Sequence, residues 1–242
     1  MKKSIKKLFC LLMCVVLIIP FALSAAAENL DTSFSQQDFL VTKGNKIYNQ
    51  KGEEIVLHGV NLGSWLIQED WLSPYEQVQD HYDILEALTD RFGVDGAYEL
   101  MNTYQDNWIT EYDLDRIKEM GFNCVRVPFW YRNFYSDDNG TKILDQNGEW
   151  DFHYLDWIVR ECSERRIYVI LDMHGAPGFQ SDAPHSGKEA TAVFMRIPMR
   201  ANFSALLRTN YGRRSHHAST VILPLQCTIF STSRHVIATT VK

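Results

Sequence analysis

The segment YVILDMHGAPG, residues 168–178, constrains the fold more than any other part of this 242-residue chain. An apolar run of strand length ends abruptly in Asp172 and His174, and a glycine-rich bend follows. An apolar run without polar alternation is typical of a strand buried on both faces, as in a parallel sheet. In α/β barrels the polar side chains at the carboxyl ends of such strands converge on one mouth, where the chemistry takes place. We therefore expect a functional site around His174.

Strand and helix patterns alternate before this segment. A helix is expected from residue 110, with Gly121 as its left-handed stop, and a strand over residues 123–128 follows directly. A second helix over residues 152–166 has apolar residues at helical spacing and leads into a strand that starts at residue 167. Strands that alternate with helices in this way predict an α/β fold with a parallel sheet.

The residues that precede this alternation predict a hairpin and a pair of helices. Two short strand-like runs surround Gly52 within residues 46–57, which indicates a small β-hairpin. Residues 84–92 have a helical pattern that stops at Gly93, and a second helix is expected over residues 95–104.

The first 27 residues have the three regions of a secretory signal. Four lysines precede an apolar run over residues 8–23, and small residues follow up to Ala27. The run is about 16 residues long, which is short for a membrane span. We therefore expect cleavage after Ala27, secretion of the chain and no membrane contact afterwards; an uncleaved anchor is the alternative. Residues 28–40 would then be a linker, and residues 41–189 the folded part.

Charge and cysteine content exclude two classes of protein. Removal of the signal leaves 20 basic and 30 acidic residues, a formal charge of −10, which argues against a nucleic-acid partner. Cys124, Cys162 and Cys227 remain, and the first two lie inside apolar periodic segments. Such cysteines behave as small buried hydrophobes and form neither a disulfide framework nor a metal site. We expect a monomer without a metal or other cofactor.

Composition changes abruptly near residue 189. All 30 Asp and Glu residues lie at or before Glu189, whereas residues 190–242 contain none and carry seven Lys or Arg. This segment has neither helical nor alternating periodicity. We interpret it as an unrelated, disordered basic tail that arose from a shifted reading frame or a damaged gene copy. The alternative is a genuine basic tail that binds an acidic surface.

Three motifs follow predicted strands in order: GVNLGSWLIQEDWLSP at residues 59–74, GFNCVRVP at residues 121–128 and LDMHGAPG at residues 171–178. Together they resemble glycoside hydrolase family 5, or cellulase family A, and within it the exo-β-1,3-glucanase and β-glucosidase branch. The resemblance covers residues 40–188. It implies a (β/α)8 barrel, of which this chain holds roughly the first three βα units. It also implies retaining hydrolysis of a β-glucan or β-glucoside oligosaccharide and no cofactor.

The resemblance also implies roles for single residues. Arg126 matches the arginine that orients the nucleophilic carboxylate, and His174 matches a histidine that hydrogen-bonds a sugar hydroxyl. Glu69 stands where the branch uses a carboxylate to grip the terminal sugar. Each residue has a structural alternative. Arg126 could form an ordinary barrel ion pair, His174 could be a core or capping histidine, and Glu69 could be a solvated loop charge. Trp65 and Trp130 are suited equally to core packing and to stacking on sugar rings.

One part of the family pattern is missing. Retaining glycosidases need two carboxyl groups about 5–5.5 Å apart, and family 5 supplies them as glutamates on the fourth and seventh strands. No carboxylate follows Glu189, so neither glutamate can stand at its family position, and we expect this chain to be inactive as a hydrolase. Two alternatives stay open. One is a non-catalytic carbohydrate-binding protein, and the other is a metal-dependent hydrolase that uses Asp172 and His174 with His185 or His58.

Overall fold

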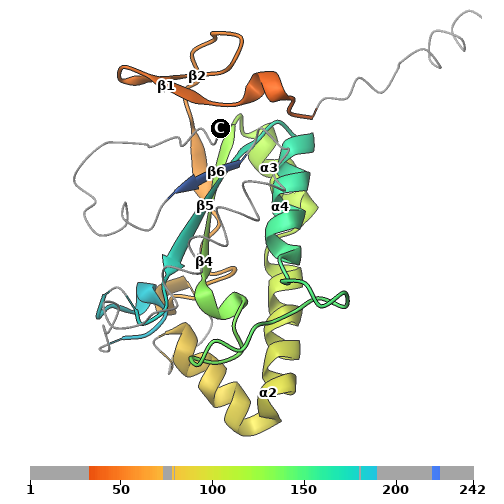
Figure 1. Ribbon diagram of the computed structural model, residues 1–242, viewed down its shortest axis with the longest axis vertical. Helices are drawn as coiled ribbons and strands as arrows, with labels where there is room; N and C mark the ends of the chain where they lie inside the picture. Colours follow the sequence, from red (N-terminus) through yellow and green to blue (C-terminus); the bar gives the residue numbers. More distant parts are fainter. Residues whose placement is uncertain (1–32, 73–77, 79, 180, 190–219, 224–242) are drawn as a thin grey trace, which may run out of the picture. The chain divides into compact units, whose positions relative to one another are not determined.

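The computed structural model describes residues 33–72, 78, 80–179, 181–189 and 220–223 (Figure 1). These residues form a two-stranded hairpin and a four-stranded sheet in the order β3-β4-β5-β6, with helices beside the sheet. The strands are β1 (Val41–Lys43), β2 (Lys46–Tyr48), β3 (Gly59–Asn61), β4 (Cys124–Trp130), β5 (Tyr168–Gly175) and β6 (Thr220–Leu223). The α-helices are α2 (His81–Trp108), α3 (Glu111–Glu119) and α4 (His153–Glu164).

The parallel α/β arrangement predicted from the sequence is confirmed. Strands β3, β4 and β5 pair in parallel and in chain order, and α3 and α4 precede β4 and β5 respectively. Strand β6 departs from the expectation that the chain is irregular after residue 189, because its four residues pair in parallel with β5. Its sequence, TVIL, is rich in β-branched residues. Pairing also satisfies backbone groups that an open edge of β5 would leave exposed.

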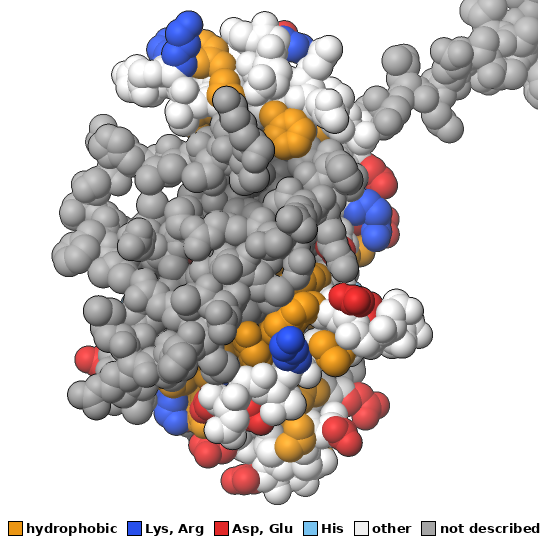
Figure 2. Space-filling view, in the orientation of Figure 1, with side chains coloured by type: hydrophobic (Ala, Val, Ile, Leu, Met, Phe, Trp, Pro, Cys, Tyr) orange, Lys and Arg blue, Asp and Glu red, His pale blue; other side chains and the backbone are white. Residues whose placement is uncertain are grey.

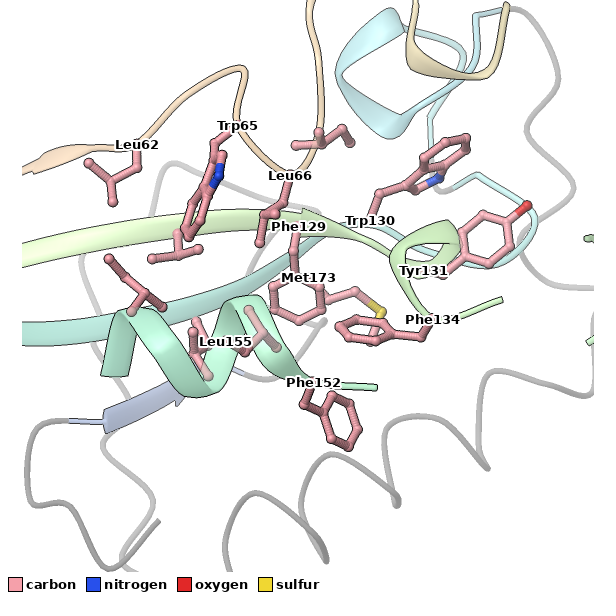
Figure 3. Close-up of a cluster of buried hydrophobic side chains, with 14 of the residues drawn as sticks. Leu62, Trp65, Leu66, Phe129, Trp130, Tyr131, Phe134, Phe152, Leu155 and Met173 are labelled. Atoms are coloured by element: carbon pink, nitrogen blue, oxygen red, sulfur yellow. The ribbon is translucent and has the colours of Figure 1, made fainter. Parts of the chain in front are cut away.

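The two faces of the sheet differ in the residues that they carry. Alternate residues of β4 and β5 bury apolar side chains on the face that meets the helices, and Figure 3 shows two of them, Phe129 and Met173, near α4. The set consists of Val125, Val127, Phe129, Val169, Leu171 and Met173, each at most 4 % exposed. The intervening residues place Arg126, Asp172 and His174 on the opposite face.

The hydrophobic core joins three segments that lie far apart in the sequence. Helix α4 contributes Leu155, Ile158, Val159 and Cys162, the positions expected from its helical spacing. The loop after β3 contributes Leu62, Trp65 and Leu66, and Figure 3 shows these three across β4 from α4. This loop is therefore held by core packing at its start, before it reaches the polar residues that follow.

Glycines end the helices where the sequence predicts. Helix α2 consists of two helical segments that meet at a kink at Gly93, which has φ +75° and ψ +170°. Helix α3 begins with a capping box, in which Thr110 and Asp113 satisfy each other's backbone N–H groups, and Gly121 follows it with φ +83°. The predicted pair of helices within α2 is thus confirmed, although it extends from residue 81 to residue 108.

The amino-terminal hairpin is more elaborate than the sequence indicates. The predicted reversal at Gly52 is present, with Ile55 N–H donating to the Ile47 carbonyl oxygen at 2.8 Å. A further reversal at Gly44 joins β1 to β2. Each of these strands has only three residues, which is too short for an alternating pattern to be recognised in the sequence.

Cys124 and Cys162 are free and buried, as expected. Burial raises the pKa of the Cys124 thiol to about 11 and raises that of Cys162 as well. Cys227, the predicted signal of residues 1–27 and most of residues 190–242 lie outside the described residues. Within the described part of the chain, no helix is long and apolar enough to cross a membrane.

Candidate functional site

Polar side chains gather on one face of three neighbouring strands, beginning at the level where β3 ends. Asn61 ends β3 and is aligned in register with Arg126 of β4, and the Arg126 Nη1 group donates to Asn61 Oδ1 at 3.3 Å. Asp172 and His174 stand near the end of β5 on the same face. Parallel pairing in this register therefore brings together residues that are up to 113 positions apart in the sequence.

One carboxylate oxygen connects the group. Asp172 Oδ2 accepts from Arg126 Nη2 and lies 3.1 Å from His174 Nδ1. Arg126 Nη2 is itself 2.9 Å from His174 Nδ1. The Asp172 side chain is 7 % exposed, whereas that of Arg126 is 29 % exposed and that of His174 is 16 % exposed. The carboxylate thus lies beneath the two side chains that reach toward solvent.

Asp172 is held in its charged form. Burial by itself would raise the pKa of this carboxyl group. The hydrogen bond with His174 and the positive charge of Arg126 outweigh burial, so the pKa of Asp172 lies below its usual range. A carboxylate that stays ionised acts as a hydrogen-bond acceptor and is poorly suited to donate a proton near neutral pH.

The loop after β5 adds a second histidine. The rings of His174 and His185 have centroids 5.5 Å apart, and Ser181 Oγ lies 3.2 Å from His185 Nε2. Burial and the charge of His174 lower the pKa of His185, and Glu69 acts in the opposite direction. His185 therefore lies within electrostatic reach of both Glu69 and His174. The family resemblance gave no role to His185.

Glu69 lies in the loop after β3, at the same end of the sheet. The loop is aligned there by a parallel bridge between Leu66 and Phe129. Trp71 Nε1 donates to Glu69 Oε2 at 3.0 Å, and the Trp71 side chain is 72 % exposed. Glu69 is half-buried, in contrast to a fully solvated loop charge. Its charged group is thus accessible and already contacts an exposed aromatic residue.

Trp65 and Trp130 lie in the core. Trp65 is 1 % exposed and donates from Nε1 to the Gln105 carbonyl oxygen at 2.9 Å. Trp130 has no measurable exposure and packs so closely on Gly175 and Gly187 that a methyl group on either would lie within 2.5 Å of its ring. This burial favours core packing over sugar stacking for both residues. Figure 3 shows the Trp130 ring at the end of β4.

A buried aspartate anchors the loop that carries His185. Asp80 caps α2 by accepting from Asp83 N–H at 2.9 Å and also accepts from Glu189 N–H at 2.8 Å. In addition, Tyr82 N–H donates to the Gly187 carbonyl oxygen at 2.9 Å. This role of Asp80 is not predicted from the sequence, because its partner lies 109 residues away. A helix-capping aspartate before residue 81 was the only local signal.

The arrangement gives no support to a metal centre. Among the described residues, no group of three or more His, Cys, Asp or Glu side chains has a geometry that could hold a metal ion. His58 is remote from the strand ends, since its ring packs on Phe122 and its N–H donates to Asn123 Oδ1 before β4 begins. The charge of Asp172 is already matched by Arg126.

Comparisons with known proteins find relatives that match part of this chain. The chain is 33 % identical over 148 residues to a beta-xylosidase of Phanerodontia chrysosporium, which covers 61 % of this chain and 30 % of that protein. It is 32 % identical over 142 residues to a glucan 1,3-beta-glucosidase of Blumeria graminis, covering 57 % and 32 % respectively. The chain thus spans about a third of the length of these relatives.

A solved structure supports the fold. The rutinosidase from Aspergillus niger superposes with a TM-score of 0.53 at 18 % identity, over 68 % of this chain and 47 % of that one. At this level of identity the likeness concerns the fold alone. The family model described as "Cellulase (glycosyl hydrolase family 5)" matches residues 87–208, half of the chain, and includes Arg126, Asp172 and His174. By this match, the chain belongs to glycosyl hydrolase family 5.

Proposed function

We propose that this chain carries the sugar-holding part of a β-glucan hydrolase site, within the first strands of a (β/α)8 barrel. The observation that carries the proposal is the convergence of Arg126, Asp172 and His174 on one face of β4 and β5, with Glu69 and His185 beside them. In barrels of this kind, side chains at the carboxyl ends of the strands bind the substrate.

Each of three side chains offers a sugar a different contact. Glu69 has carboxylate oxygens that accept from paired hydroxyl groups. His174 offers a ring nitrogen to a single hydroxyl group. Arg126 presents its guanidinium group beside them and, in a complete barrel, would orient a catalytic carboxylate. These roles follow the family resemblance, and the distances of the arginine and the histidine to Asp172 are compatible with them.

The ligand is expected to be a neutral β-linked glucan. The Blumeria graminis relative is named a glucan 1,3-beta-glucosidase. The chain itself is acidic, with a formal charge of −6, and Figure 2 shows acidic side chains scattered over the part of the molecule where Figure 1 places α2. A negative surface repels polyanions but does not hinder a neutral polysaccharide.

The 242-residue chain is proposed to bind such glucans without cleaving them. Retaining cleavage needs an acid/base and a nucleophile, two carboxyl groups about 5–5.5 Å apart. After Glu189 the sequence contains no Asp or Glu. Asp172 is engaged by Arg126 and His174 and keeps a low pKa, so it is unsuited to act as an acid. Glu69 alone cannot perform both roles.

Affinity electrophoresis of the purified chain in gels with and without laminarin tests the binding. We expect retardation by laminarin that is weakened in the Glu69→Gln and His174→Gln variants. Glu86→Gln removes an equal charge from an exposed position on α2 and should leave the retardation unchanged. Absence of retardation of the unmodified chain would overturn the binding proposal.

Hydrolysis is tested separately with laminarin and with an aryl β-glucoside. We expect no release of reducing sugar or of the aryl group above the rate without protein. Release that is abolished by a substitution in this chain would refute the proposed lack of cleavage and would require a second carboxylate that the sequence comparison did not identify.

Secretion is proposed from the signal of residues 1–27. Expression of the whole gene with its own amino terminus should place the protein in the medium with Glu28 as its first residue, which amino-terminal sequencing would detect. Recovery of the chain in the membrane with Met1 retained would favour the uncleaved anchor instead.

A further inference from the structure

The start of α2 contacts the loop that carries Glu69 at two neighbouring positions. Asp80 pairs with Glu69 in an antiparallel bridge. His81, the first residue of α2, accepts a hydrogen bond at Nδ1 from the backbone N–H of Gln68, at 3.1 Å. The loop after β3 is thus bound to the helix at Glu69 itself and at the residue before it.

We propose that His81 is a positioning residue that holds Glu69 in the candidate sugar-binding site through the backbone N–H of Gln68. This role rests on the proposed sugar-binding function and specifies how one of its contacts is prepared. A ligand-binding side chain on a loop needs support from residues whose own side chains are held by packing. The family resemblance gives no role to His81.

The His81 side chain is itself fixed by the core. The residue is 3 % exposed, and its ring centroid lies 4.6 Å from that of Trp130. Trp130 has no measurable exposure and packs closely against Gly175 and Gly187. His81 therefore provides a hydrogen-bond acceptor whose position is set by the end of β4, the strand that also carries Arg126.

The His81 ring is suited to this role because it is neutral. A backbone N–H group can only donate, so the Nδ1 atom that it meets carries a lone pair. Burial, and after it the positive charge of Arg132, lowers the pKa of His81 to about 3. The acceptor is therefore present at neutral pH and in mild acid, and the ring proton is on Nε2.

Other hydrogen bonds hold this part of the loop less firmly. The Gln68 side chain is fully buried, but neither of its amide atoms has a hydrogen-bond partner in the part of the chain that the structure describes. Glu69 N–H donates to Ser64 Oγ over a longer distance, 3.4 Å. Because the bond from Gln68 to His81 is shorter and ends on a core-packed acceptor, we expect its loss to move Glu69.

The position of Glu69 can be followed without a ligand through Trp71, whose Nε1–H donates to Glu69 Oε2 at 3.0 Å. In ¹⁵N-labelled protein, Trp71→Phe identifies the indole signal of Trp71. His81→Asn keeps a side-chain oxygen near the position of Nδ1, whereas His81→Gln moves it toward the position of Nε2. We expect the indole signal to stay in place in His81→Asn and to shift in His81→Gln. Equal shifts in both variants, or a shift in neither, would overturn the inference.

The unmodified chain gives a test that does not depend on the folding of any His81 variant. Long-range ¹H–¹⁵N correlation spectra of the histidine rings at pH 7 separate protonated from unprotonated nitrogens. We expect one ring, that of His81, to have an unprotonated Nδ1 and a protonated Nε2 and to keep this pattern down to pH 5. The signals are those that disappear in His81→Asn. A protonated Nδ1 on His81 would refute the proposed contact.

Laminarin binding, measured by affinity electrophoresis, tests whether the contact matters for the site. We expect His81→Gln to weaken binding about tenfold, the effect of losing one hydrogen bond to a charged group, and His81→Asn to restore most of it. In a Glu69→Gln background, His81→Gln should cause no further weakening, because it acts through Glu69. Additive losses would contradict the proposal. His153→Gln is the matched control, since the His153 side chain is 53 % exposed and lies on α4, and it should leave binding unchanged.

The two proposals fail in different ways. If the unmodified chain is not retarded by laminarin, the sugar-binding function fails, while the Trp71 signal still reports whether His81 holds Glu69. If the chain is retarded but folded His81→Gln binds laminarin as tightly as the parent, the function stands and the positioning role of His81 is wrong.

Discussion

The two ends of β5 each have a buried aspartate that is paired with an arginine, but the pairs differ in what surrounds them. At the amino end, Asp38 pairs with Arg166 at 2.8 Å, and Tyr168 OH donates to the Asp38 carbonyl oxygen at 3.2 Å. At the carboxyl end, Asp172 pairs with Arg126 and His174. Both carboxylates are nearly inaccessible, at 3 % and 7 % exposure of the side chain.

The difference lies in the other contacts of each aspartate. Asp38 accepts from the backbone N–H and the hydroxyl group of Ser35, and it belongs to a segment that packs Phe34 on the Tyr168 ring at 4.4 Å. Among the described residues, the hydrogen-bond partners of Asp172 are the side chains of Arg126 and His174. The same pair of residue types thus fastens the amino-terminal segment to the sheet at one end and lies beside the candidate site residue His174 at the other.

The largest expected effect on stability comes from a substitution of Gly59, the first residue of β3, at the amino end of the sheet. A methyl group on this residue would lie 1.9 Å from the Cys124 carbonyl oxygen, a backbone atom that cannot move without separating β3 from β4. We expect Gly59→Ala to lower the free energy of unfolding by about 3 kcal/mol, the upper end of the usual effect of overpacking. Urea denaturation followed by tryptophan fluorescence measures this change.

Gly96→Ala is the matched control for this substitution. Its methyl group would lie 3.0 Å from Cβ of Phe92, a side chain that is 51 % exposed. Alanine is favoured over glycine inside a helix by about 1 kcal/mol, which offsets the close contact. The stability of this variant should therefore stay within about 1 kcal/mol of the parent. Equal losses in both variants would show that the approach of β3 to β4 has been misjudged.

Local patterns in the sequence predict the elements but not the contacts between their ends. Gly93 and Gly121 end helices where expected, because a residue with positive φ interrupts the helix locally. Asp172 and His174 share a face, since alternate residues of any strand do so. By contrast, Asp38 meets Arg166 across 128 residues, and no local spacing indicates such a pair.

The tryptophans illustrate a second limit of sequence reasoning. Trp65 and Trp130 follow predicted strands, as sugar platforms do, yet both are buried while Trp71 is exposed. An aromatic ring is suited to either environment, and the choice depends on neighbours such as Gly175 and Gly187, which leave room for the Trp130 ring. The glycines come from later in the chain, so their effect is visible only after folding.

The second effect in size is expected from Asp38→Asn. Asparagine keeps the shape but removes the charge that Arg166 matches, and loss of one partner of a buried pair is strongly destabilising. Because the Arg166 side chain is 43 % exposed and can turn to solvent, we expect a loss of about 2 kcal/mol, below that of a fully buried pair. Urea denaturation at pH 7 measures it.

The stabilisation by Asp38 is expected to depend on pH. Burial would raise the pKa of Asp38, but the hydrogen bonds from Ser35 and Arg166 outweigh it and leave the pKa lowered. The stabilisation is therefore complete above the unfolded-state pKa near 3.8 and is lost as the pH falls through the lower folded-state pKa. Unfolding free energies of the parent and of Asp38→Asn should converge in acid. A constant difference down to pH 2 would contradict the assignment.

The smallest effect on stability is expected from Asp80→Asn. Its dependence on pH should be opposite to that of Asp38→Asn. Asp80 is as buried as Asp38, at 2 % exposure, but no salt bridge to it occurs within the described residues, and burial raises its pKa. A raised folded-state pKa means that its charged form weakens the fold as the pH rises through that pKa.

In the Asp80→Asn variant, asparagine still offers an oxygen to cap α2 at Asp83 N–H and to bind Glu189 N–H. We therefore expect Asp80→Asn to leave the unfolding free energy at pH 7 within about 0.5 kcal/mol of the parent or to raise it slightly. Toward pH 3 the variant should become the less stable of the two, because only the parent gains from protonation at this site. Urea denaturation of both proteins at pH 7 and at pH 3 measures this reversal in the order of their unfolding free energies. A loss of unfolding free energy at pH 7 as large as that of Asp38→Asn would contradict the prediction. It would mean that a nearby cation, for which Lys188 is the candidate, matches the charge of Asp80.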